Sequence, residues 1–293
     1  MGRWLDYWRS VRGRVVLDRG FARAMWVVPW LVVRARLRRP AASGARIAFH
    51  PHPAGPWYTL PLALGSTGVR RARRVDEADV VVAFDDQTRT RPAALARPAL
   101  NANATDIGKT RVGEVFEAVF GYPLSVDPLT HHGPMVEKSD GNGVHDGRIV
   151  EGPLADARPG MAYQRLVDTQ ARPGVTEELR CTCVGGAVSA VVRKEKPADQ
   201  RFAARYLLTR PVAPDAALST AERERLARFL HAMGLDFGSI DVLRDRMDGR
   251  IYVVDVNKTC MPVLAMNWRD LEATLATIGR DAERLILRRA ASR

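Results

Sequence analysis

The chain has 293 residues, a formal net charge of +12, an apolar fraction of 46% and three cysteines. Its length exceeds that of one small domain and predicts two or three subdomains around a cleft, and its composition is that of a globular protein. Sparse cysteines without zinc-type spacing argue against a disulfide scaffold and indicate a reducing compartment.

Residues 1–40 carry most of the excess positive charge. They contain ten Arg and two Asp, no Lys or Glu, and four of the six Trp. Arg with Trp favours binding to an anionic membrane surface, while helices packed on the body and nucleic-acid binding are the alternatives. No nucleic-acid-binding motif supports the last, so we expect no nucleic-acid partner.

The longest apolar run of this basic arm is too short to span a membrane. Ala24–Val33 has ten residues and contains Pro29, whereas a spanning helix needs about 20 residues. No small-residue cleavage site follows it. We therefore expect a cytoplasmic protein, with residues 1–40 as an arm that can bind the inner membrane face.

Residues 41–105 are typical of a small α/β domain with a parallel sheet. Strands are expected at three apolar stretches: Arg46–Phe49, Ala78–Phe84 and Pro98–Leu100. Ligands of such sheets bind beyond the carboxyl ends of the strands. The polar residues expected there are His50, His52, Asp85 and Asp86.

A helix is well signalled after Asp106, which can cap its start. Apolar residues follow at helical spacing, and Gly121 with Pro123 ends the pattern. Lys109 lies in the first turn on the apolar side. It can reach into a cleft, or it can be an ordinary solvated lysine.

The middle region, about 134–195, predicts antiparallel β-structure. Strands are expected at Pro134–Lys138, Met161–Asp168, Glu178–Val184 and Ala187–Arg193, the last two joined by the tight turn Gly185-Gly186. On such a strand Cys181 and Cys183 share one face, most simply a buried one. Arg180 and Arg193 lie on the two strands of this hairpin, where either can stabilise a phosphoryl group or remain a surface arginine.

Lys138 precedes a polar loop that contains Gly141, Asn142 and Gly143. Backbone N–H groups and a lysine can together cradle phosphates, although a plain turn is the alternative. The loop is not a Walker motif, because no Gly-Lys-Ser/Thr ends it.

A further helix begins at Ser219 or Thr220, and the chain ends in a helical stretch of about 269–289. Between them lies a predicted hairpin, Gly238–Arg244 with Ile251–Asn257. A three-residue turn, Met247-Asp248-Gly249, would place Asp241 opposite Asp255, with Asn257 on the same face. Such oxygen ligands suit magnesium, although an exposed hairpin with surface acids is the alternative.

The order of these motifs resembles the ATP-grasp superfamily, and most closely its carboxylate–amine ligases of the ribosomal-protein-glutamate-ligase type. The resemblance covers roughly residues 100–265. Its motifs are Asp106-Ile-Gly-Lys-Thr-Arg111, Val136-Glu-Lys138 with its glycine loop, Tyr163-Gln-Arg-Leu-Val-Asp168, Glu178-Leu-Arg-Cys-Thr-Cys-Val-Gly-Gly186, Ser239-Ile-Asp-Val242 and Val254-Asp-Val-Asn257.

The resemblance implies a role for each of these motifs. ATP phosphates would be held by Lys109, Lys138 and the loop residues Gly141, Asn142 and Gly143. Adenine would bind the backbone of the hinge residues Gln164, Arg165, Leu166 and Val167. Arg180 and Arg193 would be catalytic and face the phosphates and the acyl group. Mg²⁺, usually as two ions, would bind Asp241, Asp255 and Asn257.

The resemblance also implies the fold class and the function. The chain would be an α/β (α+β) protein of the ATP-grasp fold, with an N-terminal domain at 41–105 and an ATP-grasp domain at 106–293 whose lid spans about 134–195. It would join a carboxylate, of a small molecule, a peptide or a lipid-linked acid, to an amine through an acylphosphate. The alternatives are a kinase on the same scaffold and a non-catalytic ATP-binding module recruited to membranes.

Two features depart from the family pattern. The family commonly has Glu where this chain has Asp255, which shortens one carboxylate. The family asparagine is usually followed by a small residue and then Pro-Gly, whereas Lys258-Thr-Cys-Met-Pro262 follows Asn257 here.

Overall fold

The computed structural model describes residues 43–292 except 93–94, 96 and 204. The chain divides into two units, Met1–Arg36 and Leu37–Arg293, and only the second contains described residues. The basic arm expected at 1–40, with its membrane role, therefore lies outside the described residues. Within them, no helix combines the length and apolarity that crossing a membrane requires.

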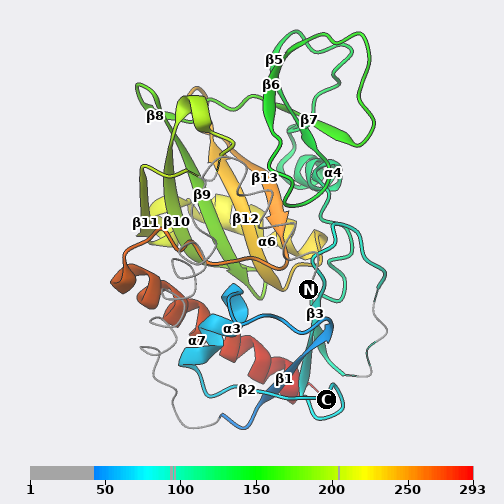
Figure 1. Cartoon of the computed structure of the whole chain (residues 1–293), viewed down its shortest axis with the longest axis vertical. Helices are drawn as coiled ribbons and strands as arrows, with labels where there is room; N and C mark the ends of the chain where they lie inside the picture. The colour runs from blue at the N-terminus through cyan, green and yellow to red at the C-terminus, as the bar shows by residue number, and fades with distance from the viewer. Residues whose placement is uncertain (1–42, 93–94, 96, 204, 293) are drawn as a thin grey trace, which may run out of the picture. The chain divides into compact units, whose positions relative to one another are not determined.

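A four-stranded parallel sheet opens the described part of the chain (Figure 1). Its order is β2-β1-β3-β4, built from β1 (Arg46–Pro51), β2 (Arg70–Arg71), β3 (Val80–Phe84) and β4 (Ala99–Leu100). This confirms the small parallel sheet expected at 41–105. β3 is buried along almost its whole length, as both-face coverage of a parallel strand requires. The short helix α3 (Thr59–Ala63) and a 3₁₀ turn, Leu64–Ser66, follow β1.

The long C-terminal helix α7 (Trp268–Ala291) packs against α3. Buried residues recur on it at helical spacing: Leu271, Leu275, Ile278, Ala282 and Ile286. Gly279 lies at the contact, because a Cβ there would stand 2.4 Å from the carbonyl oxygen of Ala63. The absence of a side chain thus lets the two helices approach closely.

A six-stranded antiparallel sheet forms the centre of the remaining structure. Its order is β11-β10-β9-β12-β13, with β8 paired to β9, and the bounds are β8 (Gln170–Arg172), β9 (Val175–Val184), β10 (Ala187–Pro197), β11 (Leu208–Val212), β12 (Phe237–Arg244) and β13 (Ile251–Asn257). Gly185 and Gly186 both have positive φ, 60° and 81°, so the expected tight turn between β9 and β10 is confirmed.

Helices α4 (Lys109–Phe120) and α6 (Thr220–Ala232) contribute to the core beneath one face of this sheet. The buried cluster joins Phe116 and Phe229 to Ile240 of β12, and it includes the free thiols Cys181 and Cys183. Burial raises the pKa of both thiols, so they act as small apolar residues. Of the two expected starts, Ser219 is the N-cap of α6, and it forms a complete capping box with Glu222. The short helix α5 (Pro214–Ala217) precedes it.

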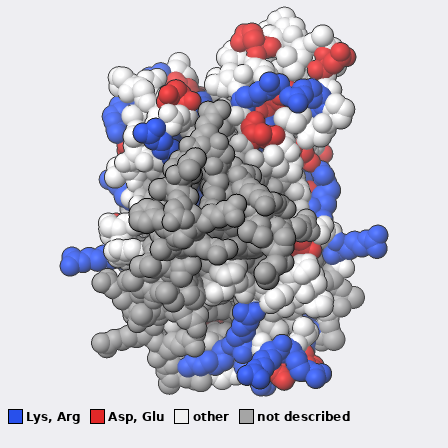
Figure 2. Space-filling model, in the orientation of Figure 1, with Lys and Arg blue, Asp and Glu red and all other residues white. Residues whose placement is uncertain are grey.

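A separate three-stranded sheet has the order β6-β5-β7, from β5 (Gly133–Ser139), β6 (Arg148–Gly152) and β7 (Met161–Arg165). The range expected for the lid, about 134–195, therefore spans two sheets, because β9 and β10 belong to the six-stranded one. Figure 2 shows acidic and basic side chains interspersed at the top of the face it presents, where Figure 1 draws the three-stranded sheet.

Candidate functional site

One face of the six-stranded sheet gathers charged side chains, and the other packs into the core. Across the ladder, Asp241 of β12 stands opposite both Arg180 of β9 and Asp255 of β13. Their strand neighbours Leu179 and Val242 are buried in the core cluster. Because strand side chains alternate between faces, the sheet places these three charged groups together on the side away from the core.

The pair Asp241–Asp255 forms as predicted, but by a different route. The hairpin turn is one residue out of the expected register, since the N–H of Asp245 donates to the carbonyl of Arg250 and Arg244 pairs with Ile251. A β-bulge then inserts Val254 and restores the Asp241–Asp255 pair. Two departures from a regular hairpin therefore cancel, and the two carboxylates share a face.

A second bulge changes which cation of β10 faces the site. The register of β9 with β10 shifts by one residue between Val188 and Ala190, so Arg180 stands opposite Val192 and Glu178 stands opposite Lys194. A one-residue slip exchanges the two faces of a strand. Arg193 consequently points to the other face, 3.3 Å from Glu177. The structure does not bring Arg193 together with Arg180, and it brings Lys194 there instead.

Ion pairs connect the charged groups on this face. An Arg180 guanidinium nitrogen lies 2.8 Å from a carboxylate oxygen of Asp241, and Lys194 Nζ lies 3.4 Å from the other. Lys194 and Lys196 both contact Glu178, the latter at 2.9 Å. Burial opposes ionisation of Glu178, but the two lysines outweigh it and hold the pKa of its carboxyl well below the ordinary value.

Lys109 and Lys138 reach the same patch from other elements. Lys109 Nζ lies 3.4 Å from Asp255 Oδ1 and donates to the carbonyl of Gly141 at 2.8 Å. Lys138 Nζ donates to the carbonyl of Val254, the bulged residue, at 2.8 Å. Lys109 is buried rather than solvated, with only 8% of its surface exposed. Burial lowers the pKa of Lys138 to about 8.

The glycine loop after β5 docks on the start of α4. The helix begins at Lys109 with Gly108 as its N-cap residue, and the expected cap, Asp106, instead accepts the N–H of Gly108 at 2.7 Å. Asp140 of the loop accepts the N–H of Thr110 at 2.7 Å, so a residue distant in sequence supplies the cap.

The segment after β3 holds the loop from its other side. Thr88 Oγ1 accepts the N–H of Asn142 at 2.8 Å. Arg89 contacts both Asp140 and Asp106, the latter at 3.0 Å. The glycine loop therefore lies beside Lys109, between the start of α4 and the segment that follows β3.

The hinge after β7 presents backbone groups without protein partners. In the described part of the chain, the N–H and the carbonyl of Leu166 form no hydrogen bond. The N–H of Val167 forms none either. The carbonyl of Val167 accepts from Arg201 at 3.1 Å. Gln164 and Arg165 lie within β7, where Gln164 pairs with Val136. Free backbone groups at Leu166 and Val167 suit a ligand that offers a donor and an acceptor.

Comparisons with known proteins find similarity in structure alone. No family model matches the chain, and no curated protein matches it in sequence. The D-alanine–D-alanine ligase of Bacillus anthracis with ATP is 12% identical, with 85% of this chain and 99% of that chain covered and a TM-score of 0.51. The ATP-grasp ligase PsnB with a minimal precursor is also 12% identical, with 83% and 99% covered and a TM-score of 0.51.

A Chryseobacterium gregarium RiPP-associated ATP-grasp ligase, in complex with ADP and a leader and core peptide, is 12% identical over 82% of this chain and 97% of that chain, with a TM-score of 0.50. These likenesses span nearly the whole of each solved chain and agree with the fold described above. The chain has the ATP-grasp fold.

The charge on this face of the ATP-grasp sheet fits a nucleotide triphosphate. Within the described residues, four of the five cations on this face pair with its three carboxylates, and Lys138 donates to the carbonyl of Val254, which leaves an excess of positive charge. The cations are Lys109, Lys138, Arg180, Lys194 and Lys196, and the carboxylates are Glu178, Asp241 and Asp255. A bound polyanion would neutralise this excess positive charge, and the attraction would be strong because the site has a low dielectric constant.

The three expected magnesium ligands lie on this face. Asp241 and Asp255 are opposite each other, and Asn257 is two residues further on. No group of three His, Cys, Asp or Glu suited to a metal exists among the described residues. Magnesium is usually bound by one or two carboxylates together with substrate phosphates. Asn257 Oδ1 accepts the N–H of Thr259 at 2.8 Å and the hydroxyl of the same residue at a longer 3.4 Å, so a cation that binds this oxygen would displace the hydroxyl. Ser239 Oγ, buried opposite Asn257, has no hydrogen-bond partner among the described residues, so the donor set fits Mg²⁺.

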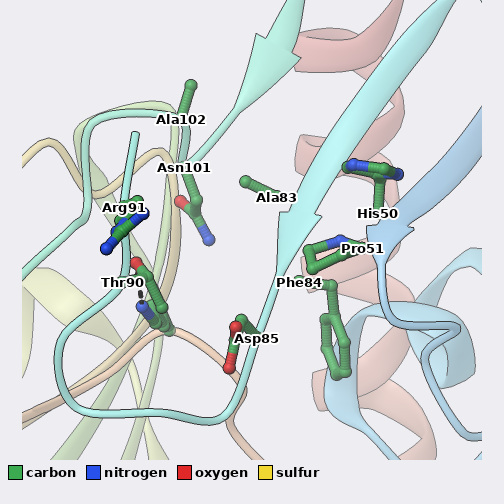
Figure 3. Close-up of a pocket in the computed structure, with 10 residues that line it drawn as sticks. His50, Pro51, Ala83, Phe84, Asp85, Thr90, Arg91, Asn101 and Ala102 are labelled. Carbon is green, nitrogen blue, oxygen red and sulfur yellow. Dashed lines mark hydrogen bonds between the residues drawn. The ribbon is translucent and has the colours of Figure 1, made fainter. Parts of the chain in front are cut away.

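A pocket of about 220 Å³ lies at the carboxyl edge of the parallel sheet (Figure 3). His50 and Asp85 line it, as expected from the ends of β1 and β3, whereas His52 and Asp86 are exposed and do not. Lys258, which directly follows Asn257, also lines it. One residue of the pocket, Lys258, is thus adjacent in the chain to one of the expected metal ligands, Asn257.

Sequence reasoning missed Glu178, Lys194 and Lys196. Lys194 and Lys196 are two residues apart on a strand, a spacing that predicts a shared face, and Glu178 and Arg180 have the same relation. That alternation could have identified the four as one charged surface. The partner of this surface could not be identified without the register of β9 and β10.

Proposed function

We propose that this chain is an ATP-dependent ligase that joins a carboxylate to an amine through an acylphosphate. The observation that carries the proposal is the convergence of Lys109, Lys138 and Arg180 on one face of the β12–β13 hairpin, around Asp241 and Asp255. Cations from three separate elements thereby surround the carboxylates best suited to hold magnesium.

Nucleotide binding would use groups that now have weak or replaceable partners. Leu166 and Val167 would offer adenine their free backbone groups. Lys109 now donates to the carbonyl of Gly141, and Lys138 donates to that of Val254. Each ammonium could instead donate a hydrogen bond to a phosphate oxygen. The loop N–H groups at Gly141, Asn142 and Gly143 would cover the phosphates.

Mg²⁺ would be held by Asp241, Asp255 and Asn257, in one or two ions. When bound, it would neutralise the phosphates and favour transfer of the terminal phosphoryl group to the substrate carboxylate. Asp241 currently shares its oxygens with Arg180 and Lys194. A cation that takes those oxygens would release Arg180 to face the acyl group.

Arg180 and Lys194 would then stabilise developing negative charge at the acyl carbon's oxygen as the amine attacks. Only 15% of the Arg180 side chain is exposed, so its charge acts in a site of low dielectric. Nothing in this chemistry requires a protein nucleophile, and the thiols Cys181 and Cys183 lie buried on the opposite face.

The solved structures that share the fold favour a ligase over a kinase. One neighbour is a D-alanine–D-alanine ligase, and two are ligases in complex with precursor or leader and core peptides. The identity of 12% transfers the fold, and the proposal for this chain rests on its own residues.

Hydroxylamine trapping tests the reaction class. Purified protein is incubated with ATP, Mg²⁺, hydroxylamine and a panel of carboxylic acids, and hydroxamate and ADP are measured. A ligase forms hydroxamate from its acid, and Asp255→Ala does not. ADP with a stable phosphorylated product and no hydroxamate would indicate a kinase instead. Nucleotide binding without ADP formation, across acids that cover amino acids and peptides, would indicate a binding module.

A further inference from the structure

The pocket at the end of the parallel sheet contains charges that the proposed chemistry does not use. Figure 3 shows Asp85, Thr90, Arg91 and Asn101 around it, with His50 on the far wall. Its volume of about 220 Å³ is below the roughly 300–1,000 Å³ of sites for drug-sized ligands. The pocket is therefore suited to a small molecule.

Lys258 is the buried cation of this pocket. Only 4% of its surface is exposed, and its Nζ donates to Thr90 Oγ1 at 3.1 Å and to the carbonyl of Ala104 at 3.2 Å. An ammonium has three protons, so one remains for a ligand.

Arg91 and Asp85 bring the two further charges. Among the described residues, neither forms an ion pair, although both line the same small pocket with Lys258. Asp85 uses one carboxylate oxygen for the N–H of Gln87 at 2.9 Å and keeps the other. Two cations and one carboxylate thus line one cavity, so the pocket suits a ligand that carries complementary charges.

We propose that this pocket binds a free α-amino acid as one of the two substrates. Its carboxylate would lie on Lys258 and Arg91, and its ammonium on the free oxygen of Asp85. The inference rests on the proposed ligase function, and it adds the substrate class. An internal peptide segment offers neither charged group, and a simple carboxylic acid would leave Asp85 without a partner.

The pocket is connected to the nucleotide side by two short routes. Lys258 follows Asn257 directly in the chain. Thr90, which accepts from Lys258, is two residues from Thr88, which holds the glycine loop through Asn142. A ligand in the pocket therefore contacts residues next to both the metal ligands and the loop over the phosphates.

Direct binding tests the inference apart from catalysis. Each of the twenty amino acids is titrated into the full chain by calorimetry or ligand-observed NMR, without nucleotide. For any that bind, the matched acid without the amine and the matched amine without the carboxylate are titrated next. We expect at least one amino acid to bind and both truncated analogues to bind about tenfold or more weakly, because each loses a hydrogen bond between charged groups.

Three variants assign the contacts. Lys258→Met and Arg91→Met should weaken the amino acid and its deaminated analogue alike, by about tenfold each, whereas Asp85→Asn should weaken the amino acid and spare the analogue. Arg91 is exposed, so its variant remains informative if Lys258→Met does not fold. Arg73→Met, an exposed arginine that does not line this pocket, is the matched control and should change nothing.

The outcomes separate this inference from the ligase proposal. Hydroxamate formation from acids without an amine, combined with no binding by any amino acid, would overturn the amino-acid site and leave the ligase standing. Amino-acid binding that Lys258→Met, Arg91→Met and Asp85→Asn leave unchanged would also overturn it. Binding with the expected variant pattern supports the site even if hydroxylamine traps nothing, in which case the ligase proposal is the one that fails.

Discussion

The face of the six-stranded sheet and the pocket of the parallel sheet both contain carboxylates and cations, but among the described residues only on the sheet face are these charges paired with one another. On the sheet face, Asp241 is paired with Arg180 and Lys194, and Glu178 with two lysines. In the pocket, Asp85 and Arg91 line one cavity without any such pair in the described structure. In the first region every carboxylate is already paired with a cation, whereas in the second Asp85 and Arg91 would gain an ion pair from a ligand.

The difference follows from how each region is built. Strand register fixes the charged groups of the sheet face across β9, β12 and β13, so that opposite charges meet at contact distance. The charged groups of the pocket, Asp85, Arg91 and Lys258, stand on segments that follow β3 and β13. Loops can hold like charges near one another for a ligand, because no ladder aligns their partners. Binding at the sheet face must therefore exchange partners, and binding in the pocket must supply them.

Removing one carboxylate of the sheet face should have the largest effect. Asp255→Ala takes a ligand from the proposed Mg²⁺ site, and ATP turnover should fall on the order of a thousandfold or more. Circular dichroism and thermal unfolding should show an intact fold. Asp248→Ala, in the exposed turn of the same hairpin, is the matched control. Unchanged turnover in Asp255→Ala would refute the metal assignment.

The joint between the two regions is the next test. Asn101, a pocket residue with φ of 61°, accepts the N–H groups of Asp236 and Phe237 and donates to the carbonyl of Phe237. Asn101→Ala should lower the free energy of unfolding by on the order of 3 kcal/mol, measured by urea titration.

Its control is the exposed neighbour Asn103, whose change to Ala should cost less than about 0.5 kcal/mol. Asn101→Gly separates the two contributions, because glycine tolerates the positive φ but makes no side-chain bonds. Equal stability of the wild type and Asn101→Ala would show that the two regions do not depend on this joint.

Adjacent residues of β10 test the role of register within the sheet face. Lys194→Met should reduce turnover by about a hundredfold, because it removes a cation from the proposed site. Arg193→Met, one residue away on the other face, should change turnover by less than about threefold. Steady-state kinetics with ATP and the acid identified by trapping make the comparison. The reverse order of effects would restore the sequence-based expectation that Arg193 faces the phosphates.

The smallest expected effect is a pH dependence from Lys138. Its pKa is about 8 in the folded chain, lowered by burial from an ordinary 10.5, so between these values the unfolded chain binds the extra proton. Stability of the wild type should therefore rise with pH through this window, relative to Lys138→Met, by on the order of 2 kcal/mol.

Urea unfolding in EDTA at pH 7, 9 and 10.5 measures this difference between the two proteins. At pH 7 both states carry the charge, and the cost of burying it is present in full. A difference that stays constant over the whole range would mean that Lys138 keeps its ordinary pKa in the folded chain.

The sequence determined the elements and their local signals. The Gly185-Gly186 turn, the Ser219 capping box and the alternation that buries Cys181 and Cys183 all follow from interactions within a few residues. The resemblance to the ATP-grasp superfamily, now supported at the level of fold, likewise came from the order of short motifs. Asp241 and Asp255 were predicted to pair, although by a turn that does not form.

Tertiary structure alone decided the register and the long-range partners. The bulge in β13 keeps Asp255 opposite Asp241, and the bulge in β10 replaces Arg193 with Lys194. Asp140 caps α4 from thirty residues away, and Lys258 reaches Thr90 across the pocket. A bulge forms where the packing of several strands favours one extra residue, so its position depends on partners distant in sequence, and a shift of one residue decides which side chains face the site.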